Sequence, residues 1–238
     1  MNRQAHAVTD LGSRQPKALK IERLLGLTPR AEPLHLLEIG TGAGGIAHYF
    51  GTHPTLPCQV TAVDVHDNRQ VHAGYDYVAV QGVELPFDDA RFDVVISNHV
   101  IEHVGDAAAQ HAHLQEIRRV MKADGSAYLA VPNRWMLTEP HYRLKFLSWL
   151  PRQWRSPYLR WSGKGDFYDC EPLQLKQLER MLAAAGFSYR NLCIEGLRET
   201  LAIERPTHWS NRLLRHVPDV LLRPLLPIFP TLIYKLQR

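Results

Sequence analysis

Short apolar runs alternate with helical patterns along the first half of the chain. Buried strands are predicted at 35–39, 59–65, 77–80, 92–97 and 126–131, where apolar residues are nearly continuous. Helices are predicted at 16–27, 44–50, 68–73 and 107–122, with Asp124-Gly125 ending the last of them. Strands that alternate with helices in this way predict a parallel sheet with helices on both faces, which is a doubly wound α/β fold.

The pattern changes after residue 133. Residues 134–165 contain seven Lys or Arg and one acidic residue, Glu139, with four tryptophans interleaved. A helix at 172–185, a strand at 188–194 and a short final strand at 231–236 are predicted beyond this segment. The segment 211–230 is apolar, but four prolines interrupt it.

Composition supports one globular domain over 1–238 and excludes several other classes. With 238 residues, 45% hydrophobic and 22% charged, the chain can bury a core, which excludes wholesale disorder, collagen and coiled coil. The net charge of +4 is mildly basic, so it permits an acidic partner without requiring one. The three cysteines are scattered and form no CxxC pair, and we recognise no secretory signal or membrane-spanning run. We therefore expect a reducing, cytoplasmic setting.

The most informative motif joins the first predicted strand to a helix through a glycine-rich turn. Gly40 and Gly42 would let the backbone approach a ligand closely, and with Gly45 they match the dinucleotide-binding fingerprint. Asp64 ends the next strand 24 positions after Gly40, near the spacing of about 20 expected for an acid that binds ribose. Glu38 would attract a cationic amine and repel a pyrophosphate, which favours another adenosine ligand over a dinucleotide.

Four motifs in order give the chain a family resemblance. The first is Glu38-Ile-Gly-Thr-Gly-Ala-Gly44, and the others are the segments 81–87 (QGVELPF), 92–104 (FDVVISNHVIEHV) and 131–133 (VPN). Over roughly residues 36–133 the chain resembles the class I S-adenosylmethionine-dependent methyltransferases that act on small molecules, lipids or glycans. The resemblance implies S-adenosylmethionine as cofactor and a seven-stranded sheet whose last strand is antiparallel. It also implies a cofactor-binding core at 14–133, a helical lid insert after strand five at 134–170, and a C-terminal helix with sheet-completing strands at 171–238.

The same resemblance assigns residues to parts of the cofactor. Glu38, Gly40 and Gly42 would hold the methionine end, Asp64 the ribose hydroxyls, Gln81 and Gly82 the adenine edge, and Asn98 the back of the methionyl site; Gly44 and Val65 complete the set. Many relatives have Asp where Gln81 stands, but a Gln amide can also pair with the adenine edge. The other interpretations are that Asp64 caps a helix and that Gln81 is an ordinary loop residue.

The histidines after the fourth predicted strand suggest two chemistries. The pattern His99-x-x-Glu102-His103 is also found in an unrelated class of zinc proteases, but no third ligand is marked and we expect no metal. Ligands of open α/β sheets bind at the carboxyl ends of the strands, so His99 is placed to remove a proton from a methyl acceptor. The alternative is that His99 packs or positions the substrate. His141 is the rival base.

The acceptor is less well defined than the donor. The basic insert suits an anionic small-molecule or lipid-linked acceptor, although it would equally suit a solvated basic face. Nucleic acid is not favoured, since no RNA-binding module is recognised and 131–135 lacks the Asn/Asp-Pro-Pro-aromatic signature. Segment 211–230 would either touch a membrane surface or pack on the sheet. We expect O-methylation; the alternatives are a non-catalytic S-adenosylmethionine-binding partner or sensor and, more remotely, an NAD-dependent dehydrogenase or the HxxEH metalloprotease.

Overall fold

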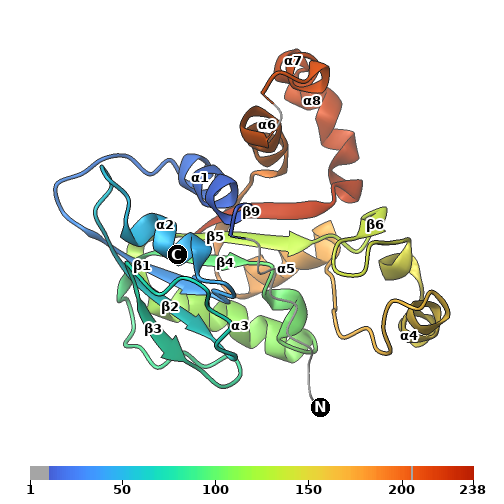
Figure 1. Cartoon of the computed structure of the whole chain (residues 1–238), viewed down its shortest axis with the longest axis horizontal. Coiled ribbons are helices and arrows are strands. Elements are labelled where there is room, and N and C mark those ends of the chain that lie inside the picture. Colours follow the sequence, from blue (N-terminus) through green and yellow to red (C-terminus); the bar gives the residue numbers. More distant parts are fainter. Residues whose placement is uncertain (1–10, 205) are drawn as a thin grey trace.

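A twisted seven-stranded sheet of order β3-β2-β1-β4-β5-β9-β8 forms the centre of the computed structural model, which describes residues 11–204 and 206–238 (Figure 1). The strands are β1 Leu34–Ile39, β2 Cys58–Asp64, β3 Asp76–Ala79, β4 Phe92–Asn98, β5 Met121–Pro132, β8 Ser188–Asn191 and β9 Thr231–Gln237. Strands β1 to β5 run parallel, and β9 is antiparallel to both β5 and β8. The predicted seven-stranded, doubly wound sheet with an antiparallel last strand is confirmed.

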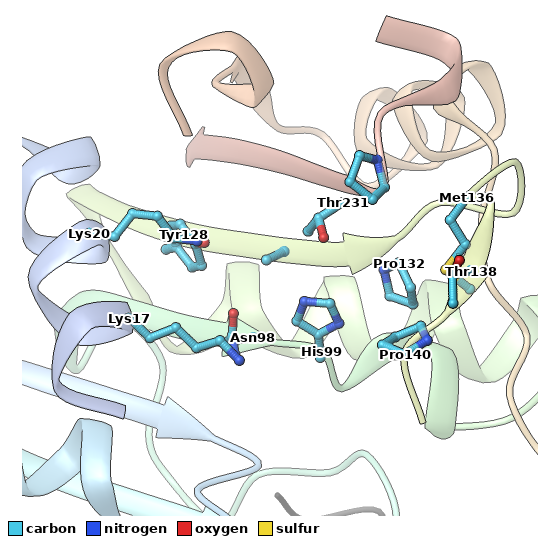
Figure 2. Close-up of a pocket in the computed structure, with 12 residues that line it drawn as sticks. Lys17, Lys20, Asn98, His99, Tyr128, Pro132, Met136, Thr138, Pro140 and Thr231 are labelled. Atoms are coloured by element: carbon cyan, nitrogen blue, oxygen red, sulfur yellow. The ribbon is translucent and has the colours of Figure 1, made fainter. Parts of the chain in front are cut away.

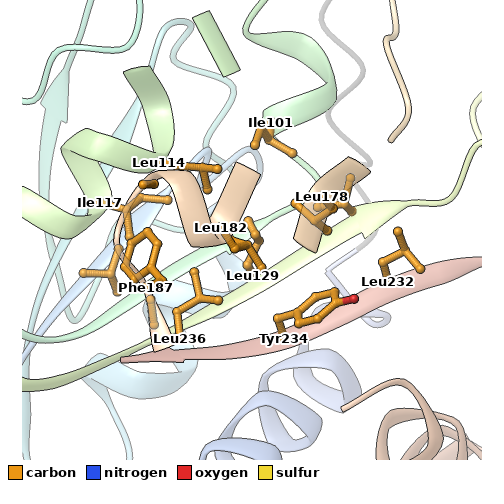
Figure 3. Packing of buried hydrophobic residues seen from close by; sticks show 14 of the residues in the cluster. Ile101, Leu114, Ile117, Leu129, Leu178, Leu182, Phe187, Leu232, Tyr234 and Leu236 are labelled. Atoms are coloured by element: carbon orange, nitrogen blue, oxygen red, sulfur yellow. The ribbon is translucent and has the colours of Figure 1, made fainter. Parts of the chain in front are cut away.

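Helices cover both faces of the sheet, as the alternating pattern predicts. They are α1 Arg14–Leu25, α2 Gly45–Gly51, α3 Ala107–Val120, α4 Arg152–Trp161, α5 Leu175–Ala184, α6 Cys193–Glu204, α7 Trp209–His216 and α8 Asp219–Leu222, with short 3-10 turns η1 Ile101–His103, η2 Leu147–Trp149 and η3 Arg223–Ile228. One core lies between the sheet and helices α1 and α2. The other lies between the sheet and helices α3 and α5 and includes Leu114, Leu178 and Tyr234 (Figure 3).

The helical insert follows β5 and has a small core of its own. It contains the two-stranded ribbon of β6 Thr138–Glu139 and β7 Leu144–Lys145, followed by η2 and α4. Leu147, Leu159 and Tyr168 are buried within it, and the insert, with β6 and α4, extends beyond the carboxyl end of β5 (Figure 1). We call residues 134–170 the lid. The division of the chain into core, lid and C-terminal part stays a prediction.

Three local predictions are wrong. Residues 68–73 form no helix, because Gln70 N and Val71 N donate to Ala43 O and hold this segment against the start of α2. The strand predicted at 188–194 stops at Asn191, whose side-chain oxygen accepts from Cys193 N and begins α6.

The helix predicted at 107–122 also ends earlier than expected. It stops at Val120, whose carbonyl accepts from Arg91 N, and the next residue already pairs with Phe92 as the first residue of β5. Asp124-Gly125 therefore lies inside the bounds of β5 and is not a helix stop.

The C-terminal segment 211–230 packs with one side and exposes the other. Leu222 and Phe229 are buried in the core, and Asn133 Nδ2 donates to the carbonyls of Pro227 and Phe229, each at 2.8 Å. Val220 and other large apolar side chains of this segment are exposed. Packing accounts for the first set, while contact with a membrane surface stays a prediction. None of the helices in the described residues is long and apolar enough to cross a membrane.

A buried carboxylate closes the turn between β1 and α2. Glu38 Oε2 accepts hydrogen bonds from the Thr41 hydroxyl at 2.7 Å and from Ala47 N at 3.0 Å. Burial raises the pKa of Glu38 to about 8, although both hydrogen bonds favour the ionised form. At a pH between the pKa of the unfolded chain and this value, Glu38 is therefore protonated in the folded protein and ionised in the unfolded chain.

We predict that this carboxyl makes stability depend on pH. Between the unfolded-chain pKa of about 4.3 and the folded pKa of about 8, the folded state binds more protons, so the free energy of unfolding should fall as pH rises. Glu38→Gln keeps an acceptor for Thr41 and Ala47 but cannot ionise, so this part of the fall should disappear. Urea unfolding across this pH range measures the difference. The control is Glu32→Gln, at an exposed position; curves for wild type and Glu38→Gln that stay parallel would refute the prediction.

A second prediction concerns the contact between α2 and the segment that follows β2. A Cβ atom built on Gly51 would overlap the carbonyl oxygen of Gly74, and a backbone atom cannot rotate away as a side chain can. Gly51→Ala should therefore lower the free energy of unfolding by about 2–3 kcal/mol. Gly26→Ala, which meets no atom but has a φ of 70°, should cost about 1 kcal/mol. Chemical unfolding compares them, and a smaller loss at Gly51 than at Gly26 would contradict the clash.

Candidate active site

Two adjoining cavities lie at the carboxyl ends of the parallel strands. The larger has a volume of about 610 Å³ and the smaller about 250 Å³. Both are lined by Lys17, Asn98, His99 and Pro140, so they meet at the end of β4. Figure 2 shows the smaller cavity, with the His99 ring between Asn98 and Pro140. In an open α/β sheet this edge is where ligands bind.

Most of the residues predicted to bind a cofactor line the larger cavity. These are Glu38, Gly40, Gly42, Asp64, Val65, Gly82 and Asn98. Gln81 is exposed and Gly44 precedes α2, and neither is among the lining residues. The geometry thus brings together seven of the nine predicted positions. Their roles toward a ligand stay predictions.

The glycine turn is held against two neighbouring strands. Gly40 has a φ of 74°, which favours glycine, and a Cβ atom there would overlap Cγ2 of Val100, so glycine suits this close approach to the segment after β4. Gly42 N donates to Asp64 Oδ2 at 2.8 Å, and Val65 N donates to Asp64 Oδ1 at 2.7 Å. Asp64 is not a helix cap, because the described residues 65–75, between β2 and β3, contain no helix.

Lysines from the first helix line the smaller cavity, and the sequence interpretation missed them. Lys17 and Lys20 lie one turn apart on α1 and face the cavity together with Tyr128 (Figure 2). Burial lowers the pKa of Lys17 to about 8, and the neighbouring charges of Arg14 and Lys20 add to this. Two lysines three residues apart were the available signal, but the helix was interpreted only by its apolar face. Their combined charge favours an anionic ligand.

The basic lid contributes less charge to the cavities than its composition suggests. Of its seven Lys and Arg residues, Arg143 lines the larger cavity. Arg155 is buried instead and donates to Leu150 O at 3.0 Å. The tryptophans of α4, Trp154 and Trp161, are exposed rather than tucked into a core.

His99 is placed at the junction of the cavities by an unusual backbone. Its φ is 59°, which is uncommon for a residue other than glycine, and its N–H donates to Ala130 O at 2.9 Å. Its ring Nδ1 lies 3.5 Å from Oε1 of the fully buried Glu102. Burial acts to raise the pKa of Glu102, but His99 and His103 outweigh it and hold that pKa below its usual value.

His103 approaches the same oxygen of Glu102 as His99 does, and it contacts His141 of the lid. His103 Nε2 is 3.8 Å from Glu102 Oε1, and the rings of His103 and His141 meet edge to face at 5.3 Å. The zinc-protease interpretation needs His99 and His103 on one continuous helix. It is wrong, because His99 has a left-handed backbone and the short turn η1 begins only at residue 101. His141 lines the larger cavity, and its role as a rival base stays a prediction.

Known proteins are similar in sequence to parts of this chain. Residues 12–192 match the family described as "Methyltransferase domain". A probable S-adenosylmethionine-dependent methyltransferase of Mycobacterium tuberculosis is 34% identical over 45% of this chain and 39% of its own length. A ubiquinone biosynthesis O-methyltransferase of Rhodopseudomonas palustris is 31% identical, over 57% of this chain and 56% of its own. A glycine/sarcosine/dimethylglycine N-methyltransferase of Actinopolyspora halophila is 28% identical, over 47% and 21%. The matched regions thus span less than two thirds of each of these relatives.

Solved structures share the fold. An S-adenosylmethionine-dependent methyltransferase from Mesorhizobium loti superposes with a TM-score of 0.59 at 14% identity, covering 96% of this chain and all of that one. The family match spans most of the chain, and the sheet has the strand order and antiparallel closing strand that the resemblance implies. The chain therefore belongs to the class I S-adenosylmethionine-dependent methyltransferases, whose methyl donor is S-adenosylmethionine.

Proposed function

We propose that this protein transfers the methyl group of S-adenosylmethionine to a hydroxyl oxygen of a small acceptor that carries an anionic group. The observation that carries the proposal is the position of His99. Its imidazole lies where the two cavities meet, and Nδ1 faces the buried carboxylate of Glu102 at 3.5 Å. A base oriented by a carboxylate suits an acceptor that must lose a proton.

The larger cavity fits the cofactor. Its volume of about 610 Å³ lies within the range of small-molecule sites. Gly40 and Gly42 line this cavity without side chains, so a ligand could approach the turn closely, and Asp64 would offer acceptor oxygens for ribose hydroxyls. Gly82 would lie along the adenine and Asn98 behind the methionyl group. The cofactor supplies a methyl group made electrophilic by the adjoining sulfonium.

The smaller cavity fits the acceptor. Lys17 and Lys20 would pair with a carboxylate or phosphate, and Tyr128 and Met136 supply apolar surface for a short carbon skeleton. Pro140 of the lid lines both cavities, so the lid covers the place where donor and acceptor would meet. Lid residues over that point help to exclude water from the reaction.

The chemistry assigned to this chain is alignment and proton removal. Methyl transfer is an in-line displacement, so the two cavities must hold the acceptor oxygen opposite the sulfur. As the new carbon–oxygen bond forms, the hydroxyl proton passes to the ring nitrogen of His99 that faces away from Glu102. The electron pair of the broken sulfur–methyl bond remains on sulfur. Glu102 stabilises the imidazolium that forms. His99 returns to its neutral form when it releases the proton to solvent.

Two other functions remain as outcomes of the tests. The relatives include both O- and N-methyltransferases, and an amine acceptor would reduce the need for a base. A non-catalytic binding protein would retain the cofactor cavity and show no turnover. The paired His99 and Glu102 favour the hydroxyl acceptor over both.

Asp64→Asn should weaken cofactor binding about 10- to 100-fold, because the amide loses the charge and one of the acceptor oxygens available to ribose. Calorimetric titration with S-adenosylhomocysteine measures the affinity, and NAD in parallel should not bind. Asp67→Asn is the matched control, since Asp67 pairs with Arg69 and does not line the cavity. Equal affinity of wild type and Asp64→Asn would remove Asp64 from the site. Failure of wild type to bind any adenosyl ligand would overturn the proposed function.

His99→Asn should lower kcat about 10²- to 10⁴-fold while leaving the affinity for S-adenosylhomocysteine within about threefold. Turnover is followed by transfer of a radiolabelled methyl group to a panel of hydroxybenzoates, neutral phenols and primary amines. We expect activity with the anionic hydroxyl compounds. His111→Asn on α3, away from both cavities, is the control. An unchanged kcat in His99→Asn would exclude His99 as the base, and preference for amines would favour N-methylation.

A further inference from the structure

A second cluster of chemically active side chains joins the lid to the core. His103 belongs to η1 after β4, His141 to the connection between β6 and β7, and Cys170 to the segment that follows α4. One potential ligand atom from each lies within 4.8 Å of the others. Cys170 is buried, and the two imidazoles are largely buried. Three residues far apart in sequence thus direct two nitrogens and one sulfur toward the same small volume.

The measured spacing suits a tetrahedral transition metal. Zinc binds imidazole nitrogen at about 2.0–2.1 Å and thiolate sulfur at about 2.3 Å, so in a tetrahedral site these two atoms lie about 3.6 Å apart. The Nδ1 of His103 and the Sγ of Cys170 are 3.7 Å apart. Two imidazoles and a thiolate also favour zinc-type ions over magnesium or calcium, which prefer oxygen.

A carboxylate lies near each of the two imidazoles. The other nitrogen of His103, Nε2, lies 3.8 Å from Glu102 Oε1, and His141 Nε2 lies 4.0 Å from Glu139 Oε1. Both carboxylates are buried. These two separations are longer than hydrogen bonds, but the negative charge of the carboxylates favours a cation nearby.

The backbone fixes the cluster on both sides. Glu171 N, next to Cys170, donates to Glu102 O, next to His103, at 2.9 Å. On the lid, Tyr142 N donates to Glu139 Oε2 at 2.8 Å, which sets the turn that carries His141. The juxtaposition therefore follows from the way the lid is attached to the core.

We propose that His103, His141 and Cys170 bind a zinc-type divalent ion that fastens the lid to the core beside the larger cavity. Coordination replaces the proton of the Cys170 thiol, which passes to solvent. Three protein ligands leave the fourth tetrahedral position open to water or to an anionic group. His103 and His141 also line the larger cavity, so this open position can face it.

The test is metal binding by the whole chain after removal of metals with a chelator. Zinc titrated against a chromophoric chelator should bind with one equivalent, and cobalt should give a sulfur-to-metal charge-transfer band. Cys170→Ser should abolish that band and weaken zinc binding more than about 100-fold, since loss of an outer partner alone costs 10- to 100-fold. Zinc should raise the Tm of wild type and not that of Cys170→Ser.

Cys58→Ser is the matched control, because it removes a thiol from β2, outside the cluster. It should keep the cobalt band and the zinc affinity. His141→Ala is the second test variant. Binding of S-adenosylhomocysteine by Cys170→Ser shows that the Cys170→Ser protein is folded. A cobalt band that survives in Cys170→Ser, or wild type that binds no zinc at micromolar concentration, would overturn the metal site and leave the proposed methyl transfer untouched.

Discussion

The site depends on how closely the chain can approach itself at the ends of β1 and β4. Gly40 lies against the side chain of Val100, and a Cβ atom at this position would overlap Cγ2 of Val100. This close approach brings the glycine turn beside the segment after β4, where His99 lines both cavities. Glu38 beneath the turn and Asp64 beside it then fix the turn by hydrogen bonds to backbone and hydroxyl groups. The turn after β1 and the segment after β4 can approach each other closely here because Gly40 has no side chain.

The parts of the fold that the sequence predicts are those governed by local pattern. Buried parallel strands need nearly continuous apolar runs, so β1, β2 and β4 were recognisable from their residues, and the glycine turn marks its own position. Prediction failed where a distant contact overrides a local preference. The segment 68–73 donates backbone hydrogen bonds to Ala43 O instead of forming a helix. Helix α3 stops where β5 pairs with β4. The start of α6 had a local signal, the capping side chain of Asn191, which was overlooked.

The site divides in the same way. Glu38, Asp64 and Asn98 sit at strand ends, where strand direction alone predicts that they meet. Lys17 and Lys20 reach the smaller cavity because α1 packs on the sheet; their spacing shows that they share one side of the helix but not that this side meets a cavity. In the lid, by contrast, the sequence predicted too many binding residues. Its charge suggested a binding surface, but Arg155 donates a hydrogen bond to Leu150 O within the lid itself. Composition therefore locates a variable segment but does not reveal which of its side chains face a ligand.

The position of β9 has a consequence for how the chain reaches this fold during synthesis. The strand lies between β5 and β8, and its register pairs Leu236 with Ala127, more than a hundred residues earlier. Until β9 has left the ribosome, the edge of β5 is unpaired and β8 has no neighbour in the sheet. During that interval the five parallel strands have an open edge at β5, and unpaired strand edges are prone to aggregate. The time between synthesis of β5 and synthesis of β9 therefore sets how long this edge stays exposed.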